Sequence, residues 1–303
     1  AAVLRGSLMM TLVLVTQGCC AGCYVADNFG HNVLGGAGIG VVPSPPAHSS
    51  IEVLLLNTVL HNNSLNEDVF TLAYGAGLFT MGTDFYTHVR IEGGTFSNNT
   101  CIGHGGALFP WTKTEMIVEG VVISNNNANH DGGGLSVDGD VRVQISNSQI
   151  FENRAFRGGG LAVNGVYSTD TNGYHRVEMR GCHLLRNWAE DSGGGLVTGS
   201  YILVVEDLII AQNSAGRSGA GIRSDFSIIN ITRCVFSENT CLDGAGLNVY
   251  GDLAILQLTH SVFGPYNLAD GDGGGLHASA DVKARFSLRP CETALWGFKE
   301  SLR

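Results

Sequence analysis

The sequence has 303 residues, of which 43 are glycine and only 6 are proline, and its formal net charge is -10 at pH 7. An apolar fraction of 44% excludes intrinsic disorder, which combines low hydrophobicity with high charge, and the scarcity of proline excludes a collagen-like chain. The acidic balance argues against a protein that grips the phosphates of a nucleic acid, so we expect no nucleic-acid partner.

The first feature in chain order is an apolar run from Leu8 to Val15. It is too short to span a bilayer, which takes about 20 residues, so we expect no transmembrane segment in this chain. With Arg5 before it and Gly22 after it, the run also has the pattern of a signal peptide. We favour a buried β-strand, because repeat-like sequence begins directly afterwards. Residues 1–22 are therefore predicted to be an irregular N-terminal coil or a signal-like segment.

Glycine-rich tetrads that end in an aliphatic residue recur along the chain. They are Gly36–Ile39, Gly75–Leu78, Gly105–Leu108, Gly132–Leu135, Gly158–Leu161, Gly193–Leu196, Gly219–Ile222, Gly244–Leu247 and Gly273–Leu276. Such a repeat is typical of a solenoid. Glycine at these turns permits positive φ and a close approach of successive backbones. We assign that structural role to Gly134, Gly160, Gly195 and Gly246.

An asparagine precedes each later tetrad and stands three residues after an apolar residue. The pairs include Leu60/Asn63, Phe96/Asn99, Ile123/Asn126, Ile150/Asn153, Leu184/Asn187, Ile210/Asn213 and Phe236/Asn239. Because asparagine tolerates the left-handed conformation and bonds its own backbone, it suits a tight corner of the chain. If the corners are in register, these side chains stack as a ladder whose amides bond neighbouring coils. The alternative is that each asparagine only favours the turn and points to water.

Paired apolar residues lie ten and eight positions before each corner, as Val143 and Ile145 do before Asn153. A spacing of two puts both side chains on one face of a strand. No stretch between the units is long or periodic enough for a crossover helix. The pattern predicts an all-β fold, a parallel β-helix (solenoid) of about nine coils. The regular coils are expected at about residues 23–280 of a single domain, 1–303, with a C-terminal cap at 281–303.

The alternation of these tetrads with Phe-x-x-Asn resembles the repeats of the polymorphic membrane protein family. An example is Phe96 and Asn99 followed by Gly105-Gly106-Ala107-Leu108. The resemblance covers roughly residues 23–280 and implies a right-handed β-helix of the pectin-lyase-like group. It also implies a secreted or surface-exposed protein, often an adhesive one, and hence an extracellular or cell-surface location.

The eight cysteines are Cys19, Cys20, Cys23, Cys101, Cys182, Cys234, Cys241 and Cys291. Cys182 and Cys234 occupy equivalent places two coils apart, about 9.6 Å, which exceeds the roughly 7 Å between Cα atoms that a disulfide tolerates. We expect most cysteines to be buried thiols. No histidine stands at zinc-like spacing from the cluster of Cys19, Cys20 and Cys23, which argues against a zinc site.

Two motifs raise the question of an enzyme. Gly103-His104-Gly105 looks like the Gly-His-Gly of polygalacturonases, but the paired aspartates of that family are missing. We read His104 as the occupant of a variable turn position that holds Asp131 and Arg157 in the next two repeats. The second motif is an acidic column of Asp225, Asp252 and Asp281, which would stack closely enough to hold Ca²⁺, with Arg223 or Lys283 as a base. We favour solvated corners for these aspartates.

Aromatic residues suggest a binding surface. Phe79 and Phe109 each follow an inward leucine by one residue, so they should point outward on adjacent coils, with Trp111 on the same face and Tyr86 in the loop beyond Phe79. An exposed aromatic group of this size binds sugar or protein. The alternative is that the insertions at 66–74 and 82–88 fold over it.

The sequence therefore predicts a non-enzymatic recognition or adhesion scaffold without a cofactor, whose partner is a cell-surface glycan or protein. The alternative is a polysaccharide-active enzyme or carbohydrate-binding protein that uses a groove along the parallel strands, as pectate lyases do. Near-identical coils without a unique cluster of acids and bases favour the scaffold.

Overall fold

The computed structural model describes residues 3–5, 17–31, 35–42, 50–66, 73–164, 176–251, 254–279 and 282–287. These described residues form strands, turns and bends and contain no helix. The run from Leu8 to Val15 and most of the expected C-terminal cap lie outside them.

The strands form three parallel sheets, which we number in the order in which each coil passes through them. The first sheet contains β1 (Val3–Arg5), β2 (Gln17–Ala21), β3 (Tyr24–Ala26), β6 (Ile51–His61), β9 (Thr87–Ser97), β12 (Thr114–Glu119), β13 (Val122–Ser124), β16 (Val141–Ser146), β17 (Gln149–Phe151), β20 (Arg176–Arg180), β21 (His183–Leu185), β24 (Ile202–Glu206), β25 (Ile209–Ala211), β28 (Ile228–Thr232), β29 (Val235–Ser237), β32 (Ile255–Thr259), β33 (Val262–Phe263) and β36 (Lys283–Ser287).

The second sheet contains β4 (Phe29–His31), β7 (Ser64–Asn66), β10 (Thr100–Cys101), β14 (Asn127–Ala128), β18 (Arg154–Arg157), β22 (Trp188–Ser192), β26 (Ser214–Ala215), β30 (Thr240–Cys241) and β34 (Leu268–Ala269). The third sheet contains β5 (Ile39–Val41), β8 (Leu78–Met81), β11 (Leu108–Trp111), β15 (Leu135–Asp138), β19 (Leu161–Asn164), β23 (Leu196–Gly199), β27 (Ile222–Asp225), β31 (Leu247–Tyr250) and β35 (Leu276–Ala278).

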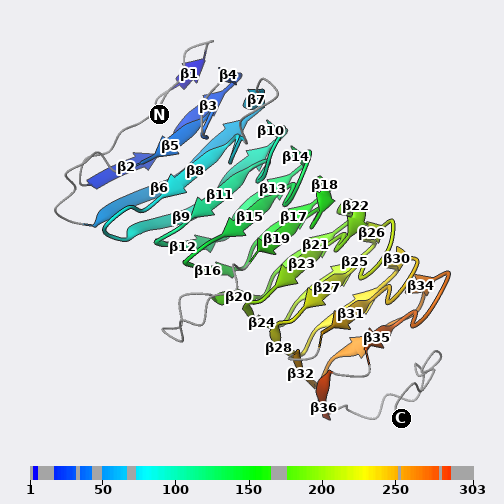
Figure 1. Ribbon diagram of the computed structural model, residues 1–303. Coiled ribbons are helices and arrows are strands. Elements are labelled where there is room, and N and C mark those ends of the chain that lie inside the picture. Colours follow the sequence, from blue (N-terminus) through cyan, green and yellow to red (C-terminus); the bar gives the residue numbers. More distant parts are fainter. Residues whose placement is uncertain are drawn as a thin grey trace.

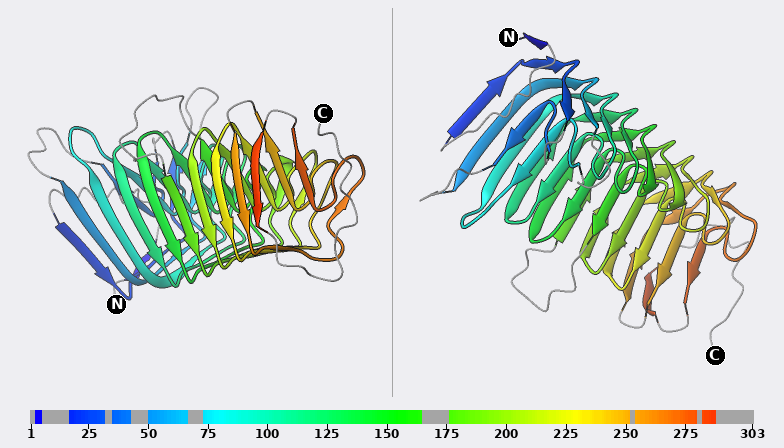
Figure 2. Two further views of the ribbon diagram at one scale, coloured as in Figure 1. Left: turned by 90° about the horizontal axis from the view of Figure 1, so that it is seen from below. Right: turned by 45° about the horizontal axis from the view of Figure 1, so that its top comes forward.

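Each coil runs through the first sheet, turns at the asparagine into the second, and turns at the glycine tetrad into the third (Figure 1). Successive coils lie side by side from the N-terminal to the C-terminal end, which makes the parallel β-helix visible in both views of Figure 2. Leu135 pairs with Leu161 and Leu161 with Leu196, so the tetrads are structurally equivalent. Within the described residues the second and third sheets have nine strands each, which matches the predicted number of coils.

The core is the interior of the solenoid. The aliphatic residues of the first eight tetrads and the predicted apolar pairs, such as Val143 and Ile145, belong to one buried cluster, against which the half-buried Leu276 of the ninth tetrad packs. Period-two alternation places the intervening residues, such as Arg142 and Gln144, on the outside. Each coil therefore buries its inward stripe against the coils above and below.

The corner asparagines form a ladder inside the solenoid. Each side-chain nitrogen donates to the side-chain oxygen of the next coil, at 2.8–3.1 Å, along the series Asn28, Asn63, Asn99, Asn126, Asn153, Asn187, Asn213, Asn239 and Asn267. Asn153, for example, also donates to the carbonyl of Ile123 and accepts from the backbone N–H of Asn126. The alternative in which these side chains point to water is wrong.

The left-handed conformation lies at a different residue from the one we expected. Glu152 (φ 55°) precedes Asn153 and Arg186 (φ 52°) precedes Asn187, whereas the ladder asparagines themselves are not left-handed. The preceding residue turns the chain, because the asparagine must keep its carboxamide aimed into the coil.

Positive φ and close backbone approach, which we had assigned to the same glycines, occur at different glycines of the tetrad. Gly158 has φ 62°, whereas Gly134, Gly160, Gly195 and Gly246 do not have positive φ, so that part of the prediction is wrong for all four. The close approach is present: a Cβ at Gly160 would lie 2.6 Å from the carbonyl oxygen of Gly195 and 3.1 Å from the amide of Asn187.

The cysteines follow the prediction in part. Cys101, Cys182 and Cys234 are buried free thiols, and Cys241 is free and half-buried. Burial raises the pKa of the Cys234 thiol to about 11. Cys23 is disulfide-bonded, so the expectation of a buried thiol is wrong there.

Candidate functional site

The external angle between the second and third sheets carries a cluster of aromatic and charged side chains, and we call it the outer corner. One side is the turn position before each tetrad, where Tyr74 pairs with His104 and Asp131 with Arg157. The other side is the outward face of the third sheet, where register aligns Trp111 with Asp138 and Asp138 with Asn164. The equivalence of His104, Asp131 and Arg157 as one turn position is therefore correct.

Aromatic rings fill the N-terminal part of the outer corner. Phe79 and Phe109 are paired on adjacent coils with ring centroids 6.1 Å apart. Tyr74 covers them, at 4.7 Å from Phe109 and 5.5 Å from Trp111. Both phenylalanines are only 1% exposed, so the expected exposed group is wrong for them. Trp111 and Tyr74 remain half-exposed and form the accessible surface of the cluster.

Tyr86 lies apart from this group. It stands at the turn from the third to the first sheet, where its hydroxyl donates to Asp140 at 3.0 Å and its ring lies 6.5 Å from His88. The prediction that Tyr86 joins the surface of Phe109 and Trp111 is wrong, because the loop carries it past the end of β8.

The middle of the outer corner is a charged cluster around one buried carboxylate. Asp131 is only 3% exposed at its side chain and accepts two hydrogen bonds from Arg157, both at 2.8 Å. Asn164 donates to the same carboxylate at 3.0 Å, and His104 lies 3.3 Å from it. The carboxylate thus joins side chains from three successive coils.

The two aspartates of this region have opposite pKa shifts. Burial raises the pKa of Asp131, but hydrogen bonds from His104 and Arg157 outweigh burial and lower it to about 2. Burial raises the pKa of Asp138, and the backbone hydrogen bond from Gly139 opposes that rise only in part. Asp131 is consequently a fixed anion that orients Arg157 and Asn164, whereas Asp138 is the more readily protonated of the two.

The outward side chains of Trp111, Asp138 and Asn164 form a row across three coils, spaced by about 4.8 Å per coil. An indole face beside a carboxylate and an amide provides an apolar platform and both acceptors and donors of hydrogen bonds. His104 and Arg157, on the opposite side of the outer corner, add further donors.

The structure contradicts the predicted acidic column at Asp225, the one member that it describes. Asp225 pairs in register with Tyr250 rather than with an aspartate, because the tetrad aliphatics Ile222 and Leu247 fix the alignment. Its carboxylate is bound by Arg223 at 2.7 Å. Asp252 and Asp281 lie outside the described residues. No group of three or more potential metal ligands occurs in the part of the chain that the structure describes.

The family of the chain follows from comparison with family models. The model described as "Right handed beta helix region" matches residues 118–281, more than half of the chain. The chain belongs to the right-handed β-helix family. Comparison with curated proteins and with solved structures gave no match. In this β-helix, no helix of the described residues is both long and apolar enough to cross a membrane.

The repeat spacing places His104, Asp131 and Arg157 at one turn position of this β-helix, but we did not predict that these side chains bind one another. The signal that was missed is that opposite charges occupy the same turn position in consecutive coils, which predicts an ion pair. Asp138 and Asn164 stand three residues after their tetrad aliphatics, as Trp111 does, so the same count would have placed them in one row with the indole.

Proposed function

We propose that this right-handed β-helix is a non-enzymatic recognition module that binds a glycan at the outer corner. The observation that carries the proposal is the row of Trp111, Asp138 and Asn164, with Tyr74 stacked beside the indole. Sugar rings present an apolar face and a rim of hydroxyls, so they suit an aromatic platform flanked by planar polar groups.

The charge of the outer corner favours a neutral glycan over a polyanionic one. Arg157 is a cation of the outer corner, and Asp131 already neutralises it through two hydrogen bonds. The chain as a whole carries a net charge of -10, which repels uronic acid polymers at low salt.

A secreted or cell-surface location belongs to the same proposal. The disulfide of Cys23 supports it, because disulfides persist in oxidising compartments. The resemblance of the repeats to those of polymorphic membrane proteins supports an adhesive role.

A polysaccharide-active enzyme is the second candidate, and one observation favours it. Environments that push two neighbouring aspartates to opposite pKa shifts are a feature of acid–base pairs in glycoside hydrolysis. Against it, Asp131 is buried and bound by Arg157, Asn164 and His104, which leaves it no lone pair directed at a substrate. Release of reducing ends from neutral or acidic polysaccharides, abolished by Asp138→Asn, would establish the enzyme instead.

Binding is tested by titrating the protein with neutral and acidic oligosaccharides and following calorimetric heat. We expect saturable binding of a neutral oligosaccharide and at least a tenfold loss of affinity in Trp111→Ala, the size typical of losing a stacked platform. Trp188→Ala is the matched control, because Trp188 lies in the second sheet and stacks on Arg154 at 4.1 Å. Equal affinities of wild type and Trp111→Ala, or no saturable binding by the wild type, would refute the proposal.

A further inference from the structure

The outer face of the first sheet carries a groove that is separate from the outer corner. It encloses about 780 Å³ above β6, β9, β12 and β16. Leu54 and Ile117 are its outward aliphatic side chains, two coils apart with Arg90 between them in register, and Glu52, His88 and Glu115 stand along one end. A second hollow of about 470 Å³ continues it in the strand direction, with Glu92 and Glu119 in its lining, and Arg90 lines both.

The groove has a repeating pattern along the strand direction. On β12 the outward residues are Glu115, Ile117 and Glu119, so a carboxylate stands on each side of a branched aliphatic side chain. Alternate residues of a strand are about 6.8 Å apart. An extended chain laid along β12 has the same spacing between its alternate side chains.

The charges of the groove leave a negative surplus. Its linings contain four glutamates, Glu52, Glu92, Glu115 and Glu119, and two arginines, Arg90 and Arg142. Arg90 is bonded to Glu92 and lies 3.5 Å from Glu119, and His88 lies 3.1 Å from Glu115. Arg142 also reaches out of the groove to Glu178, at 3.6 Å. Glu115 and Glu119 are 37% and 48% exposed at their side chains, so a ligand cation can reach both.

From this pattern we infer that the groove binds an extended peptide segment with the sequence pattern basic-x-aliphatic-x-basic. The two basic side chains pair with Glu115 and Glu119, and the aliphatic side chain between them packs on Ile117. Arg90 stays bonded to Glu92 when the ligand takes Glu119. This groove is independent of the glycan site proposed at the outer corner. It lies on the first sheet, after the turn that leaves the third sheet, and the two sites share no residue.

A simple polyamine would satisfy the carboxylates but not the spacing. A polyamine places methylene groups over Ile117 without a branched side chain that packs against it. Contact with Ile117 thus distinguishes a peptide from a diffuse polycation.

Fluorescence anisotropy of the labelled pentapeptide Lys-Ser-Leu-Ser-Lys tests the inference. We expect saturable binding that weakens from about 50 mM to about 500 mM salt, because exposed ion pairs are screened. The double variant Glu115→Gln/Glu119→Gln should lose affinity by about fivefold or more, and Ile117→Ser by a similar factor. The peptides Glu-Ser-Leu-Ser-Glu and Lys-Ser-Ser-Ser-Lys should bind more weakly by the same order.

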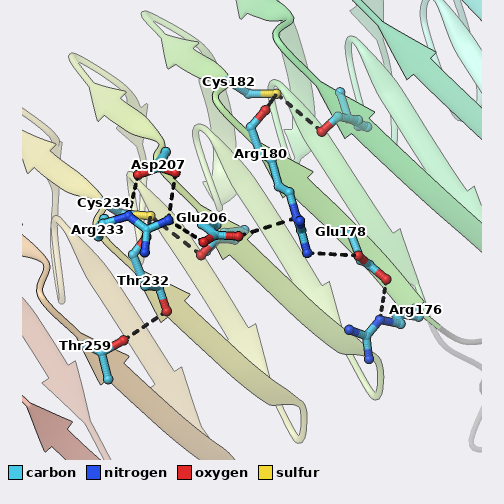
Figure 3. Close-up of polar contacts among 12 residues, drawn as sticks. Arg176, Glu178, Arg180, Cys182, Glu206, Asp207, Thr232, Arg233, Cys234 and Thr259 are labelled. Carbon is cyan, nitrogen blue, oxygen red and sulfur yellow. Dashed lines mark hydrogen bonds and ion pairs between the residues drawn. The ribbon is translucent and has the colours of Figure 1, made fainter.

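Matched controls occupy the same two columns of the first sheet, beyond the groove. Register takes Glu119 through Ser146 and Arg180 to Glu206, and Ile117 through Gln144 and Glu178 to Val204. Glu206 belongs to the network with Arg180 and Arg233 that Figure 3 shows. Glu206→Gln and Val204→Ser should leave peptide affinity unchanged.

Three outcomes would overturn the inference. They are absence of saturable binding by the folded wild type, equal affinity for the charge-reversed peptide, and full competition by spermidine at the same charge concentration. The melting temperature of each variant is measured as well. If it equals that of the wild type, a loss of affinity is caused by the change in the groove and not by unfolding.

Discussion

A single carboxamide in the ladder satisfies four groups. Asn153 accepts from the backbone N–H and the side chain of Asn126, and it donates to the carbonyl of Ile123 and to Asn187. Asparagine is the residue that offers a donor and an acceptor at this reach. Its side chain is buried, so any lost bond leaves an unpaired group in a site of low dielectric constant.

Asn153→Asp should therefore destabilise the fold by about 3 kcal/mol, because a carboxylate would face the carbonyl of Ile123 and the side-chain oxygen of Asn187. Asn153→Leu should cost about 2 kcal/mol despite its greater apolarity. Equilibrium denaturation measures both. The Asp variant should regain stability as the pH falls, because the protonated acid donates one of the lost bonds.

The control for this change is Asn125→Asp, one residue earlier than the ladder asparagine of its coil. Asn125 is exposed and has φ 56°, a conformation that aspartate also adopts. Its stability should stay within about 0.5 kcal/mol of wild type. An Asn153→Asp variant as stable as Asn125→Asp would remove the ladder from the list of stabilising features.

At the scale of the element, the tetrad turn is defined by two different constraints on glycine. The first glycine, such as Gly158, reverses the chain with positive φ. The third, such as Gly160, lets the turn of the next coil lie directly against it. The strand that follows is short, so its pairing depends on that close contact.

Gly160→Ala should lower the free energy of unfolding by about 3 kcal/mol, because the added methyl would overlap the carbonyl of Gly195 and press on Asn187. Gly199→Ala is the matched control at the end of the next strand, where no atom lies within 4 Å of the added carbon and φ is not positive. Thermal unfolding of the two variants provides the comparison. Equal melting temperatures would show that the turns adjust freely.

Elements that repeat were predictable from the sequence, and elements that do not repeat were not. Spacing alone located the strand pair at Val143 and Ile145, the ladder at Asn153 and the contact at Gly160, because each recurs in every coil. The cover that Tyr74 forms over Phe79 and Phe109 was predicted only as an alternative, in which the insertion at 66–74 folds over the aromatic group, because a single insertion has no repeat that fixes its position. The acidic column failed at Asp225 because Asp225 stands three residues after its tetrad aliphatic and Asp252 stands five after its own, so the register pairs Asp225 with Tyr250.

At the scale of the whole molecule, side chains outside the core also connect coils. Asp131 binds His104 from the preceding coil and Arg157 and Asn164 from the following one. Its pKa is about 2 in the folded protein and 3.8 ordinarily, so folding favours the ionised form. The resulting stability is present above about pH 4 and is lost as the pH falls through about 2.

We expect this link to contribute about 2 kcal/mol at neutral pH, from a pKa difference of nearly two units at 1.36 kcal/mol each. Asp131→Asn should therefore be less stable than wild type at pH 7, with the two curves converging below about pH 2. Urea denaturation as a function of pH measures the difference. Asp225→Asn, whose carboxylate pairs with Arg223 of its own strand, is the control and should cost less stability at pH 7 than Asp131→Asn, because its ion pair connects no coils.

The carboxamide dipoles of the asparagine ladder all point the same way along the axis of the solenoid. Every carboxamide has its oxygen toward the N-terminal neighbour and its N–H toward the C-terminal one, from Asn28 to Asn267. The dipoles of the side chains therefore add along the axis, whereas dipoles in random orientation would cancel. Asn267 donates to the backbone carbonyl of Phe236, as the ladder asparagines from Asn63 onward do to the preceding coil, and its second N–H donates to the carbonyl of Gly264 in place of a further asparagine. A whole coil that carries its asparagine can be added or removed without reversing any dipole, whereas a coil that lacks it divides the series into two shorter ones.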